Sequence, residues 1–450
     1  MFVGRLKELE YLEDNYHKEG SNILVIYGHK GVGKTSLMFR FVRGKEVSYY
    51  CARPCSFEEQ QNMWLQELNL RVDRDEDGLG RILNAQQNTT EQKKVLIIDE
   101  FQNIVKYSDQ FMLWLIRFLK EQSKEYLVLL CSSSINFVEN GFVPRIGGLA
   151  LGISGFFKVP ELGFVDCVTY FKNFTTRDCM EVYHILGGMP SYWARFSDKL
   201  SVEENIKRCI LHPDSFLYEE GQRIVAEELR ELNVYNTILF CLANGLNKLN
   251  DLHVHTGYSR AKISVYIKNL MERELVEKVF SFDNASSINA KKGVYRITNR
   301  YLHFYFQFMF QRQSQLIMLG SKRFYEDYIK EPIASFHQNG FKRICTEYLT
   351  ILNEKEMLPI KASKTGEWVG KDGTIDIVMQ NEEWDSLLCF CNWEKEILTI
   401  DDYNRYLGII ESARLHPDHI YIFSAGEFDE NLKLKERFSD ELNLIDINTL

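Results

Sequence analysis

One glycine-rich loop constrains the fold of this 450-residue chain more than any other feature. The apolar run Asn22–Tyr27 (NILVIY) is followed directly by Gly28–Ser36 (GHKGVGKTS), which satisfies the pattern G-x-x-x-x-G-K-[ST]. Glycines at these positions let backbone N–H groups curl around an anion, and the helix that follows adds the positive end of its dipole. Strand, loop and helix in this order predict a phosphate-binding loop.

The polar groups of the loop have expected roles. The Lys34 ammonium can reach the β- and γ-phosphates of a nucleoside triphosphate, and the Thr35 hydroxyl can ligate Mg²⁺. The rest of the predicted cradle is Gly28, Gly31, Val32, Gly33 and Ser36. The alternative, a plain glycine turn into a helix, explains neither the strand before the loop nor the acidic segment described next.

That segment is an apolar strand that ends in two carboxylates. Val95–Ile98 (VLII) is followed by Asp99 and Glu100. We expect Asp99 to hold the water shell of Mg²⁺ and Glu100 to polarise the attacking water as a general base. Solvated acids that merely cap a strand are the alternative. Together with the loop, the pair predicts that the chain binds ATP with Mg²⁺ and hydrolyses it.

A third strand adds hydroxyl groups. Tyr126–Cys131 (YLVLLC) runs into three consecutive serines, 132 to 134. In a parallel sheet these serines would lie between the two motifs. We take Ser133 as the residue that orients the water or the γ-phosphate, with a simple turn as the alternative.

The order of apolar runs sets the domain plan. Residues 1–157 alternate short branched runs with amphipathic stretches, which indicates a P-loop NTPase core: a parallel sheet with helices on both faces. Residues 158–225 are expected to form a helical lid, 226–318 a helix-rich domain with a hairpin, and 319–450 a mixed domain. The fold class is therefore α/β.

With these residues in hand, the chain resembles the archaeal-type AAA-like ATPases related to the STAND branch. The resemblance rests on four segments: Phe2–Arg5 with Glu8-Leu9, Asp99–Gln102, Gly187–Pro190 with Tyr192, and Tyr295–Phe304. It implies that Gly4 and Arg5 lie against the adenine and that Pro190, in the lid motif, contributes to the nucleotide site.

The chain also departs from the family pattern. Lys30 and Gly31 stand where the family P-loop usually carries arginine. The family stretch that follows the serines appears here as Val143-Pro144-Arg145. The resemblance makes Arg145 a candidate arginine finger that acts across a subunit boundary. A surface arginine without a catalytic role is the alternative.

The resemblance makes 226–318 a winged-helix domain. Helices are expected at Val234–Asn244, Leu249–Thr256 and Ser259–Arg273, followed by a two-stranded wing within Leu275–Ile297. In DNA-binding versions the third helix enters the major groove while basic side chains grip phosphates. Such side chains are Arg260, Lys262 and Lys268 on the helix and Lys291 and Lys292 on the wing. Duplex DNA is thus a possible partner, and a packing or relay module is the alternative.

The last domain resembles the PD-(D/E)xK nuclease-like domain, a restriction-endonuclease-like α/β fold. Asp376 matches the metal-binding aspartate of that family, whereas Phe390 and Asn392 occupy the positions of its second carboxylate and its lysine. Lys342 replaces a further glutamate. One carboxylate does not build the Mg²⁺ site, unless Glu347 or Glu394 moves inward. We therefore expect a domain retained for self-association or for binding a protein partner, and no nuclease activity.

Composition narrows the remaining choices. A net charge of −9 excludes a generic polyanion binder, no apolar run is long enough to span a membrane, and the start carries no apolar signal core. The ten cysteines and the pair His253/His255 lack the spacing of zinc ligands, so reduced thiols and a cytoplasmic location are expected. Two alternatives to an ATPase remain: a slowly exchanging nucleotide switch, and a DNA-processing effector with nuclease activity.

Overall fold

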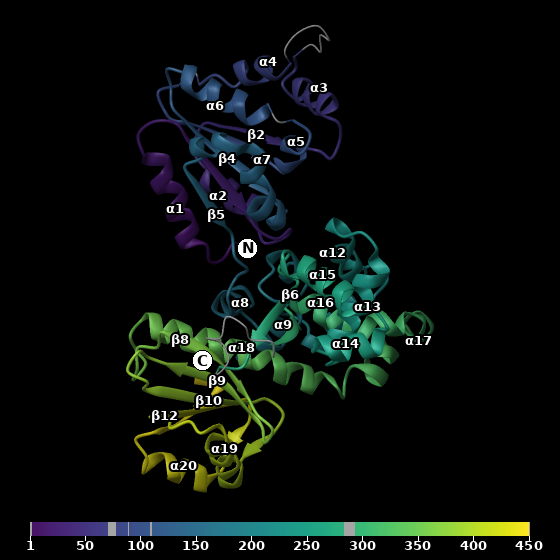
Figure 1. The fold of residues 1–450 in the computed structure, drawn as a ribbon, viewed down its shortest axis with the longest axis vertical. Coiled ribbons are helices and arrows are strands. Elements are labelled where there is room, and N and C mark those ends of the chain that lie inside the picture. Colours follow the sequence, from purple (N-terminus) through teal and green to yellow (C-terminus); the bar gives the residue numbers. More distant parts are fainter. Residues whose placement is uncertain (1, 71–77, 89, 109, 283–292, 450) are drawn as a thin grey trace. The chain divides into compact units, whose positions relative to one another are not determined.

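The computed structural model describes residues 2–70, 78–88, 90–108, 110–282 and 293–449. The chain divides into two compact units, which are coloured along the sequence in Figure 1. One unit consists of Met1–Leu162 and Met189–Ser191, and the other of Gly163–Gly188 and Tyr192–Leu450.

The first unit is built on a five-stranded parallel sheet. Its strands are β1 (Asn22–Tyr27), β2 (Val47–Cys51), β3 (Lys94–Asp99), β4 (Tyr126–Ser132) and β5 (Gly155–Lys158). They lie in the order β2-β3-β4-β1-β5, and every neighbouring pair is parallel. All six residues of β3 and all seven of β4 are buried, because both faces of the sheet are covered. The parallel sheet predicted for this region is confirmed.

Helices cover the two faces of this sheet. The face that carries Leu96 and Leu130 packs on a cluster of apolar side chains from α3, α4, α5, α6 and the turns after β4. On the other face, Cys131 contacts Met38 of α2. The helices of this unit are α1 (Leu6–His17), α2 (Lys34–Phe41), α3 (Phe57–Glu67), α4 (Gly78–Asn84), α5 (Gln102–Val105), α6 (Phe111–Glu121), η1 (Phe137–Phe142), α7 (Val143–Ile146) and η2 (Gly147–Gly152).

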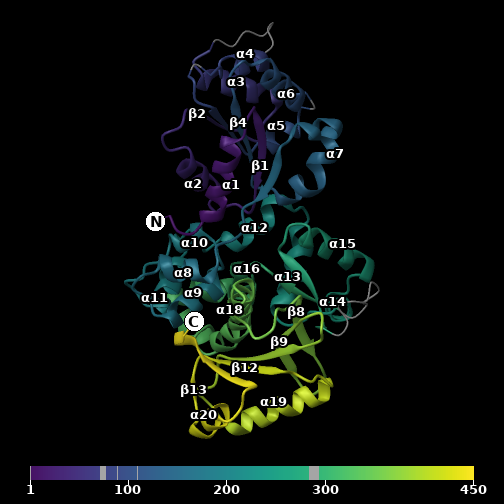
Figure 2. The ribbon, with the colours of Figure 1, turned by 90° about the vertical axis from the view of Figure 1, so that its left-hand side faces the viewer.

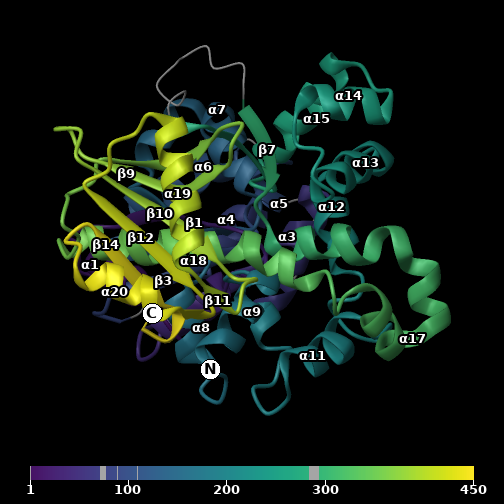
Figure 3. The same ribbon diagram turned by 90° about the horizontal axis from the view of Figure 1, so that it is seen from below.

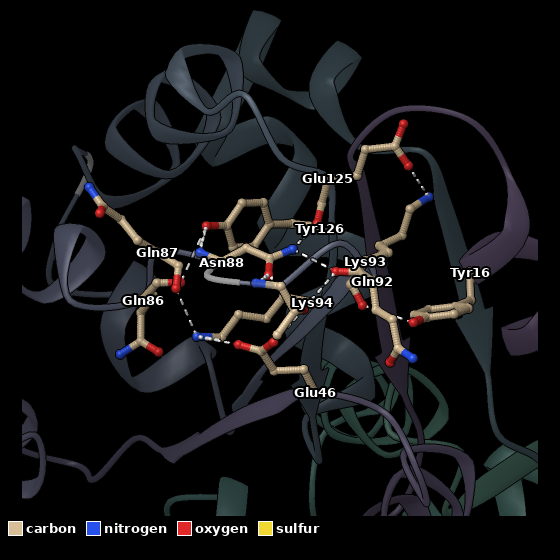
Figure 4. Close-up of polar contacts among 11 residues, drawn as sticks. Tyr16, Glu46, Gln86, Gln87, Asn88, Gln92, Lys93, Lys94, Glu125 and Tyr126 are labelled. Carbon is tan, nitrogen blue, oxygen red and sulfur yellow. Dashed lines mark hydrogen bonds and ion pairs between the residues drawn. The ribbon is translucent and has the colours of Figure 1, made fainter.

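Charged side chains form a network at the amino edge of the sheet, where β3 and β4 begin (Figure 4). Lys93 and Lys94 are both buried. The Lys93 ammonium lies 3.3 Å from the Glu125 carboxylate, and the Lys94 ammonium lies 3.6 Å from that of Glu46. The Tyr16 hydroxyl donates to the Lys93 carbonyl at 2.9 Å. The acids compensate the charges of the two lysines, and the Tyr16 hydrogen bond joins α1 to the start of β3.

The second unit begins with helices that pack on the long helix α18 (Ile333–Glu354). The buried rings of His184 on α9 and His337 on α18 place their Nδ1 atoms 3.1 Å apart. Glu347 of α18 accepts a hydrogen bond from the Phe164 N–H at the start of α8, at 2.6 Å. The helices of this region are α8 (Phe164–Tyr170), α9 (Thr176–Leu186), α10 (Pro190–Trp193), α11 (Val202–Asn205), η3 (Ile206–Ile210) and α12 (Glu220–Glu228).

Three helices and a hairpin come next, gathered together in Figure 3. They are α13 (Leu232–Ala243), α14 (Leu249–Thr256), α15 (Arg260–Met271), β6 (Val276–Phe280) and β7 (Gly293–Ile297). β6 and β7 pair antiparallel, with Val276 opposite Ile297. Three helices and a hairpin occur in the expected order, and their assignment as a winged helix stays a prediction. Lys291 and Lys292 lie outside the described residues.

Aromatic-rich helices lead from the hairpin to the last domain. They are α16 (Arg300–Phe304), η5 (Tyr305–Met309), η6 (Phe310–Arg312) and α17 (Gln313–Tyr328). Tyr301, Phe304, Tyr305 and Phe306 are all buried. No helix among the described residues combines the length and the apolarity that a bilayer crossing requires.

The last domain is a second five-stranded sheet between α18 on one face and α19 and α20 on the other (Figure 2). The order is β14-β12-β10-β9-β8, antiparallel from β8 to β10 and parallel from β10 to β14. Its elements are β8 (Lys364–Val369), β9 (Thr374–Gln380), β10 (Ser386–Asn392), β11 (Ile397–Leu398), α19 (Ile400–Ala413), β12 (His419–Ser424), β13 (Glu427–Phe428), α20 (Glu430–Arg437), β14 (Leu442–Asp446) and η7 (Ile447–Thr449).

The hairpin is fastened to this second sheet. Arg296 of β7 makes two hydrogen bonds to Glu367 of β8, at 2.8 and 2.6 Å. Ser281, just after β6, forms a β-bridge with Glu367, and the buried ring of Phe282 belongs to the core of the sheet domain. The hairpin and the sheet therefore share a core and an ion pair.

Candidate functional site

The loop between β1 and α2 has the backbone of an anion cradle. Gly28, Gly31 and Gly33 have φ angles of 153°, 85° and 98°, a region that residues with a Cβ rarely adopt. A Cβ on Gly28 would lie 2.6 Å from the Val159 carbonyl oxygen, and one on Gly31 would lie 2.3 Å from the Ser191 Oγ. Only glycine therefore fits at these positions.

The lysine of the loop is folded over the cradle. Lys34 is the first residue of α2 and is buried. Its ammonium donates to the carbonyl oxygens of Gly28 at 2.8 Å and His29 at 3.0 Å. The positive charge of Lys34 is thus centred on the loop, where a phosphate group would be held.

A hydroxyl and a carboxylate meet at the carboxyl edge of the sheet. The Thr35 hydroxyl donates to Asp99 Oδ2 at 3.2 Å, so the two residues expected to hold Mg²⁺ lie together. The Tyr49 hydroxyl, from β2, donates to the same oxygen at 3.1 Å. Burial, and then the Asp99 charge, raise the pKa of Tyr49, which keeps the phenol protonated as a donor.

Glu100 follows in a strained conformation. Its φ is 51°, in the left-handed region that costs a residue with a Cβ of the order of 1 kcal/mol or more. Its Oε2 accepts from the Ser133 hydroxyl at 2.7 Å, from the Ser133 N–H at 3.2 Å, and from the Gln102 amide. Ser133 thus touches the expected general base, which is a different partner from the water or γ-phosphate expected of it.

The N-terminal segment supports the loop from outside. Gly4 and Arg5 both have positive φ, at 63° and 69°. The buried Arg5 guanidinium donates to the Val32 carbonyl at 2.9 Å and pairs with Glu8 at 2.8 Å. Arg5 therefore bonds to the phosphate loop itself, and its expected position against the adenine stays a prediction.

The short segment Met189–Ser191 covers the loop. The Ser191 N–H donates to the Gly31 carbonyl at 3.3 Å. A Cβ on Gly33 would lie 3.7 Å from Pro190 Cγ, which is ordinary contact. Pro190 thus lies beside the phosphate loop. Its contribution to the nucleotide site, which the resemblance implies, stays a prediction.

Two expected site residues lie on the surface. Ser36 is exposed on the first turn of α2, and Arg145 is exposed on α7. The role of Arg145 across a subunit boundary stays a prediction.

Sequence reasoning missed Tyr49 and assigned no role to Gln102. Tyr49 lies on the strand next to β3, so its reach to Asp99 depends on strand order and register. Gln102 lies in the predicted acidic segment, but its hydrogen bond to Glu100 depends on the turn at Glu100, which the sequence pattern does not predict. A tyrosine near the end of a strand in a predicted parallel sheet was the available signal.

The donors present fit a nucleoside triphosphate with Mg²⁺. The hydroxyl of Thr35 and the carboxylate of Asp99 are the hard oxygen ligands that this ion prefers. The cradle leaves no room for a Cβ at Gly28 or Gly31. Gln102 Oε1, beside Glu100, is buried without a hydrogen-bond partner and is available to a donor such as water.

Comparison with known proteins gives the site a family. Residues 2–196 match the family described as an ATPase domain predominantly from Archaea. Through this domain the chain belongs to the archaeal-type ATPase family. Residues 305–404 match a second family, described as archaeal and bacterial proteins of unknown function.

Two relatives of this ATPase come from Methanocaldococcus jannaschii. An uncharacterized protein is 25% identical over 431 residues, covering 91% of this chain and 95% of the relative. An uncharacterized ATP-binding protein is 39% identical over 54 residues, covering 11% of this chain and 92% of the relative.

Solved structures with a related outline are more distant from this ATPase. The Aeropyrum pernix ORC2 protein, in its ADPNP–ADP complexes, has a TM-score of 0.48 and 16% identity, covering 70% of this chain and 94% of that protein. A signal transduction ATPase with a tetratricopeptide repeat sensor from Pyrococcus horikoshii has a TM-score of 0.29 and 16% identity, covering 79% and 52%.

The chain carries basic side chains on the outer face of α15. Arg260, Lys262 and Lys268 are exposed, while Ile263, Ile267 and Leu270 are buried. His253 Nδ1 donates to the Tyr258 carbonyl oxygen at 2.7 Å, and His255 is exposed. Among the described residues, no group of three or more histidine, cysteine or acidic side chains has the geometry of a metal site.

In the C-terminal sheet, Phe390 and Asn392 make contacts with neighbouring side chains and backbone. Phe390 is buried and stacks on Tyr406, with ring centroids 4.1 Å apart. The Asn392 amide donates to the Lys395 carbonyl and the Ser424 hydroxyl, at 2.9 and 3.0 Å. These contacts belong to packing and turn formation.

The two acids that might have moved toward Asp376 have other partners. Glu347 accepts from Phe164 N–H and from the Tyr183 hydroxyl at 3.1 Å, and Glu394 accepts from Ser335 at 2.7 Å. The acid that interacts electrostatically with Asp376 is Glu367, which sequence reasoning missed. It is already paired with Lys342 and Arg296.

Proposed function

We propose that the chain hydrolyses ATP and that its nucleotide state is coupled to a lid, a winged helix and a nuclease-like domain that has lost its metal site. The observation that carries the proposal is the 3.2 Å contact between Thr35 and Asp99, with Glu100 adjacent. A hydroxyl, a carboxylate and a second acid in this order are what Mg²⁺-dependent hydrolysis requires.

The proposed roles follow from the contacts. The backbone of Gly28–Lys34 and the Lys34 ammonium would hold the phosphates, and Thr35 and Asp99 would hold Mg²⁺, which neutralises phosphate charge when bound. Glu100 would take the proton of the attacking water. Ser133 would keep the Glu100 carboxylate oriented, consistent with its two hydrogen bonds to Oε2.

The proposed route of coupling is the segment Met189–Ser191. It touches the phosphate loop through Ser191 and Pro190, and it is continuous in the chain with α9 before it and Tyr192 after it. A change in the position of the loop on ATP binding would therefore be transmitted through this segment to the end of α9. Conformational coupling of this kind needs differential contacts in the two nucleotide states.

The proposed domains are the core at 1–157, the lid at 158–225, the winged helix at 226–318 and the nuclease-like domain at 319–450. Ten free cysteines are compatible with a reducing, cytoplasmic location. The basic outer face of α15 supports contact with duplex DNA. ATP turnover that rises with duplex and weakens steeply with salt would support that contact, and turnover indifferent to duplex would oppose it.

Steady-state phosphate release by the purified full chain tests the hydrolysis. We expect sustained, Mg²⁺-dependent turnover that Glu100→Gln abolishes while ATP binding persists. Turnover unchanged in Glu100→Gln would contradict the assignment of the base.

A second candidate is a nucleotide switch that hydrolyses very slowly. The observation in its favour is the arrangement of Glu100, whose Oε2 already accepts three hydrogen bonds from Ser133 and Gln102. A base held in this way accepts a proton from water through Oε1, or through Oε2 after one of these donors is displaced. A single round of phosphate release without sustained turnover would favour the switch.

A further inference from the structure

Tyr49 has a hydrogen bond that the functions assigned above do not use. It lies on β2, next to β3, and its ring packs against Phe39 of α2 with centroids 5.2 Å apart. About two fifths of the residue is exposed, at 39%. Its hydroxyl nevertheless points to Asp99 and donates to Oδ2 at 3.1 Å.

The register of the two strands explains the reach. Cys51 lies opposite Asp99, and Tyr49 lies opposite Ile97. Because alternate residues of a strand share a face, Tyr49 and Asp99 lie on the same face of the sheet, displaced by two residues. This displacement is about 6.6 Å along the strand, which a phenol side chain spans. The contact is therefore a consequence of where the tyrosine is placed on β2.

Both oxygens of Asp99 are held by donors. Oδ1 accepts from the Glu100 N–H at 3.0 Å, and Oδ2 accepts from Thr35 and Tyr49. The Thr35 hydroxyl is the group expected to turn to the metal when Mg²⁺·ATP binds. Tyr49 would then be the side-chain donor left on Oδ2, so the carboxylate would keep its orientation.

We propose that Tyr49 is a positioning residue that holds Asp99 in the orientation needed to bind Mg²⁺. The proposal rests on the proposed function, since it takes Asp99 as the acid that holds the metal. Partners that orient metal-binding groups typically contribute 10- to 100-fold to metal affinity.

The test is the Mg²⁺ dependence of nucleotide binding by Tyr49→Phe, which removes only the hydroxyl. Binding of a fluorescent ATP analogue to the full chain is titrated with MgCl₂ and repeated in EDTA. We expect the Mg²⁺ midpoint to rise about 10-fold while affinity in EDTA is unchanged. Tyr107→Phe is the matched control, because Tyr107 is 61% exposed in the same unit, and it should leave both values unchanged.

Three outcomes would overturn the proposal. The first is a Mg²⁺ midpoint in Tyr49→Phe equal to that of the wild type. The second is an equal loss of affinity with and without Mg²⁺, which a purely structural role would produce. The third is wild-type binding that does not depend on Mg²⁺, which would also remove the metal role of Asp99. Absent ATP turnover would count against the proposed hydrolysis alone, since this measurement follows binding.

Discussion

The two five-stranded sheets of this protein each carry an aspartate, and the two aspartates have different neighbours. Asp99 ends β3 in the first sheet and has a hydroxyl from Thr35, a hydroxyl from Tyr49 and a second acid as neighbours. Asp376 lies within β9 of the second sheet, and its Oδ2 accepts from the Cys391 N–H at 2.9 Å. The first aspartate is thus surrounded by groups suited to a cation, whereas the second is half-buried and bound by a backbone N–H.

The cations near the two aspartates sharpen the difference. In the first sheet, Lys34 lies on carbonyl oxygens of the phosphate loop. In the second sheet, Lys342 and Arg296 both form ion pairs with Glu367. The charge of Glu367 in turn acts on Asp376. The charges of Glu367 and Asp376 are thus compensated by side chains of the protein itself. An aspartate in a sheet therefore indicates a metal site only when its neighbours are also suited to a metal ion.

The largest expected effect concerns the first sheet. Glu100→Gln should lower ATP turnover by about 100-fold or more, because general-base catalysis typically contributes that much. ATP affinity should stay within a few fold, whereas Lys34→Ala should lose both binding and turnover. Phosphate release and equilibrium binding measure the two quantities, with the exposed Glu121→Gln as the control. Equal turnover in Glu100→Gln and wild type would mean that the acid beside Asp99 has no catalytic role, so the first sheet would no longer differ from the second in this respect.

The next effect concerns the ion pair in the second sheet. Arg296→Met should destabilise the protein by about 2 kcal/mol, because it removes two hydrogen bonds to a buried carboxylate that keeps Lys342 as its other partner. Urea unfolding measures the loss. Arg323→Met, at a surface pair 3.4 Å long, should change stability by less than about 0.5 kcal/mol. Equal effects of the two changes would mean that Glu367 gains little from Arg296.

The glycine cradle should respond with a smaller loss of function. Gly31→Ala imposes a Cβ at a φ of 85° and 2.3 Å from Ser191 Oγ, which should weaken ATP binding about 10-fold. Gly44→Ala is the matched control: its φ is 79°, but a Cβ there meets nothing within 4 Å. This control should lose stability and keep its affinity. A parallel loss of affinity in both variants would point to general strain.

The smallest effect is a pH dependence in the second sheet. Burial, opposed mainly by Lys342, raises the pKa of Asp376 above its unfolded value of 3.8. Between the two pKa values the native state binds more protons, so stability falls as pH rises, by at most about 1.4 kcal/mol per unit. Asp376→Asn should flatten this part of the curve and leave ATP turnover unchanged. Unfolding measured from pH 4 to 8 checks the slope, with the exposed Asp372→Asn as the control.

Much of the fold could be predicted from local patterns. The strand at Asn22–Tyr27 and the helix at Leu249–Thr256 have the expected bounds, because short apolar runs and helical periodicity are local signals. The meeting of Thr35 with Asp99 was also predictable, since parallel strands bring their carboxyl ends to one edge.

The contacts that were missed depend on long-range placement. Tyr49 reaches Asp99 only because β2 borders β3 in one register, and Glu367 meets Arg296 only because the hairpin packs on β8. Neither the order of the strands nor the packing of the hairpin can be predicted from the hydrophobic periodicity of a short segment. The contact of Ser133 with Glu100 was missed for a similar reason, since the turn at Glu100 brings that carboxylate back to the serine. The expected role of Ser133 toward water or the γ-phosphate stays a prediction.

The histidines that join α9 to α18 have a consequence for hydrogen placement. Their Nδ1 atoms are 3.1 Å apart, so one ring must carry its hydrogen there while the other presents a lone pair. His184 Nε2 is buried without a partner, and a bare acceptor is tolerated there more readily than an unpaired N–H. His184 is therefore the ring that donates and His337 the ring that accepts. Because burial lowers both pKa values, that of His337 to about 3, the two rings are uncharged tautomers of opposite kind at neutral pH.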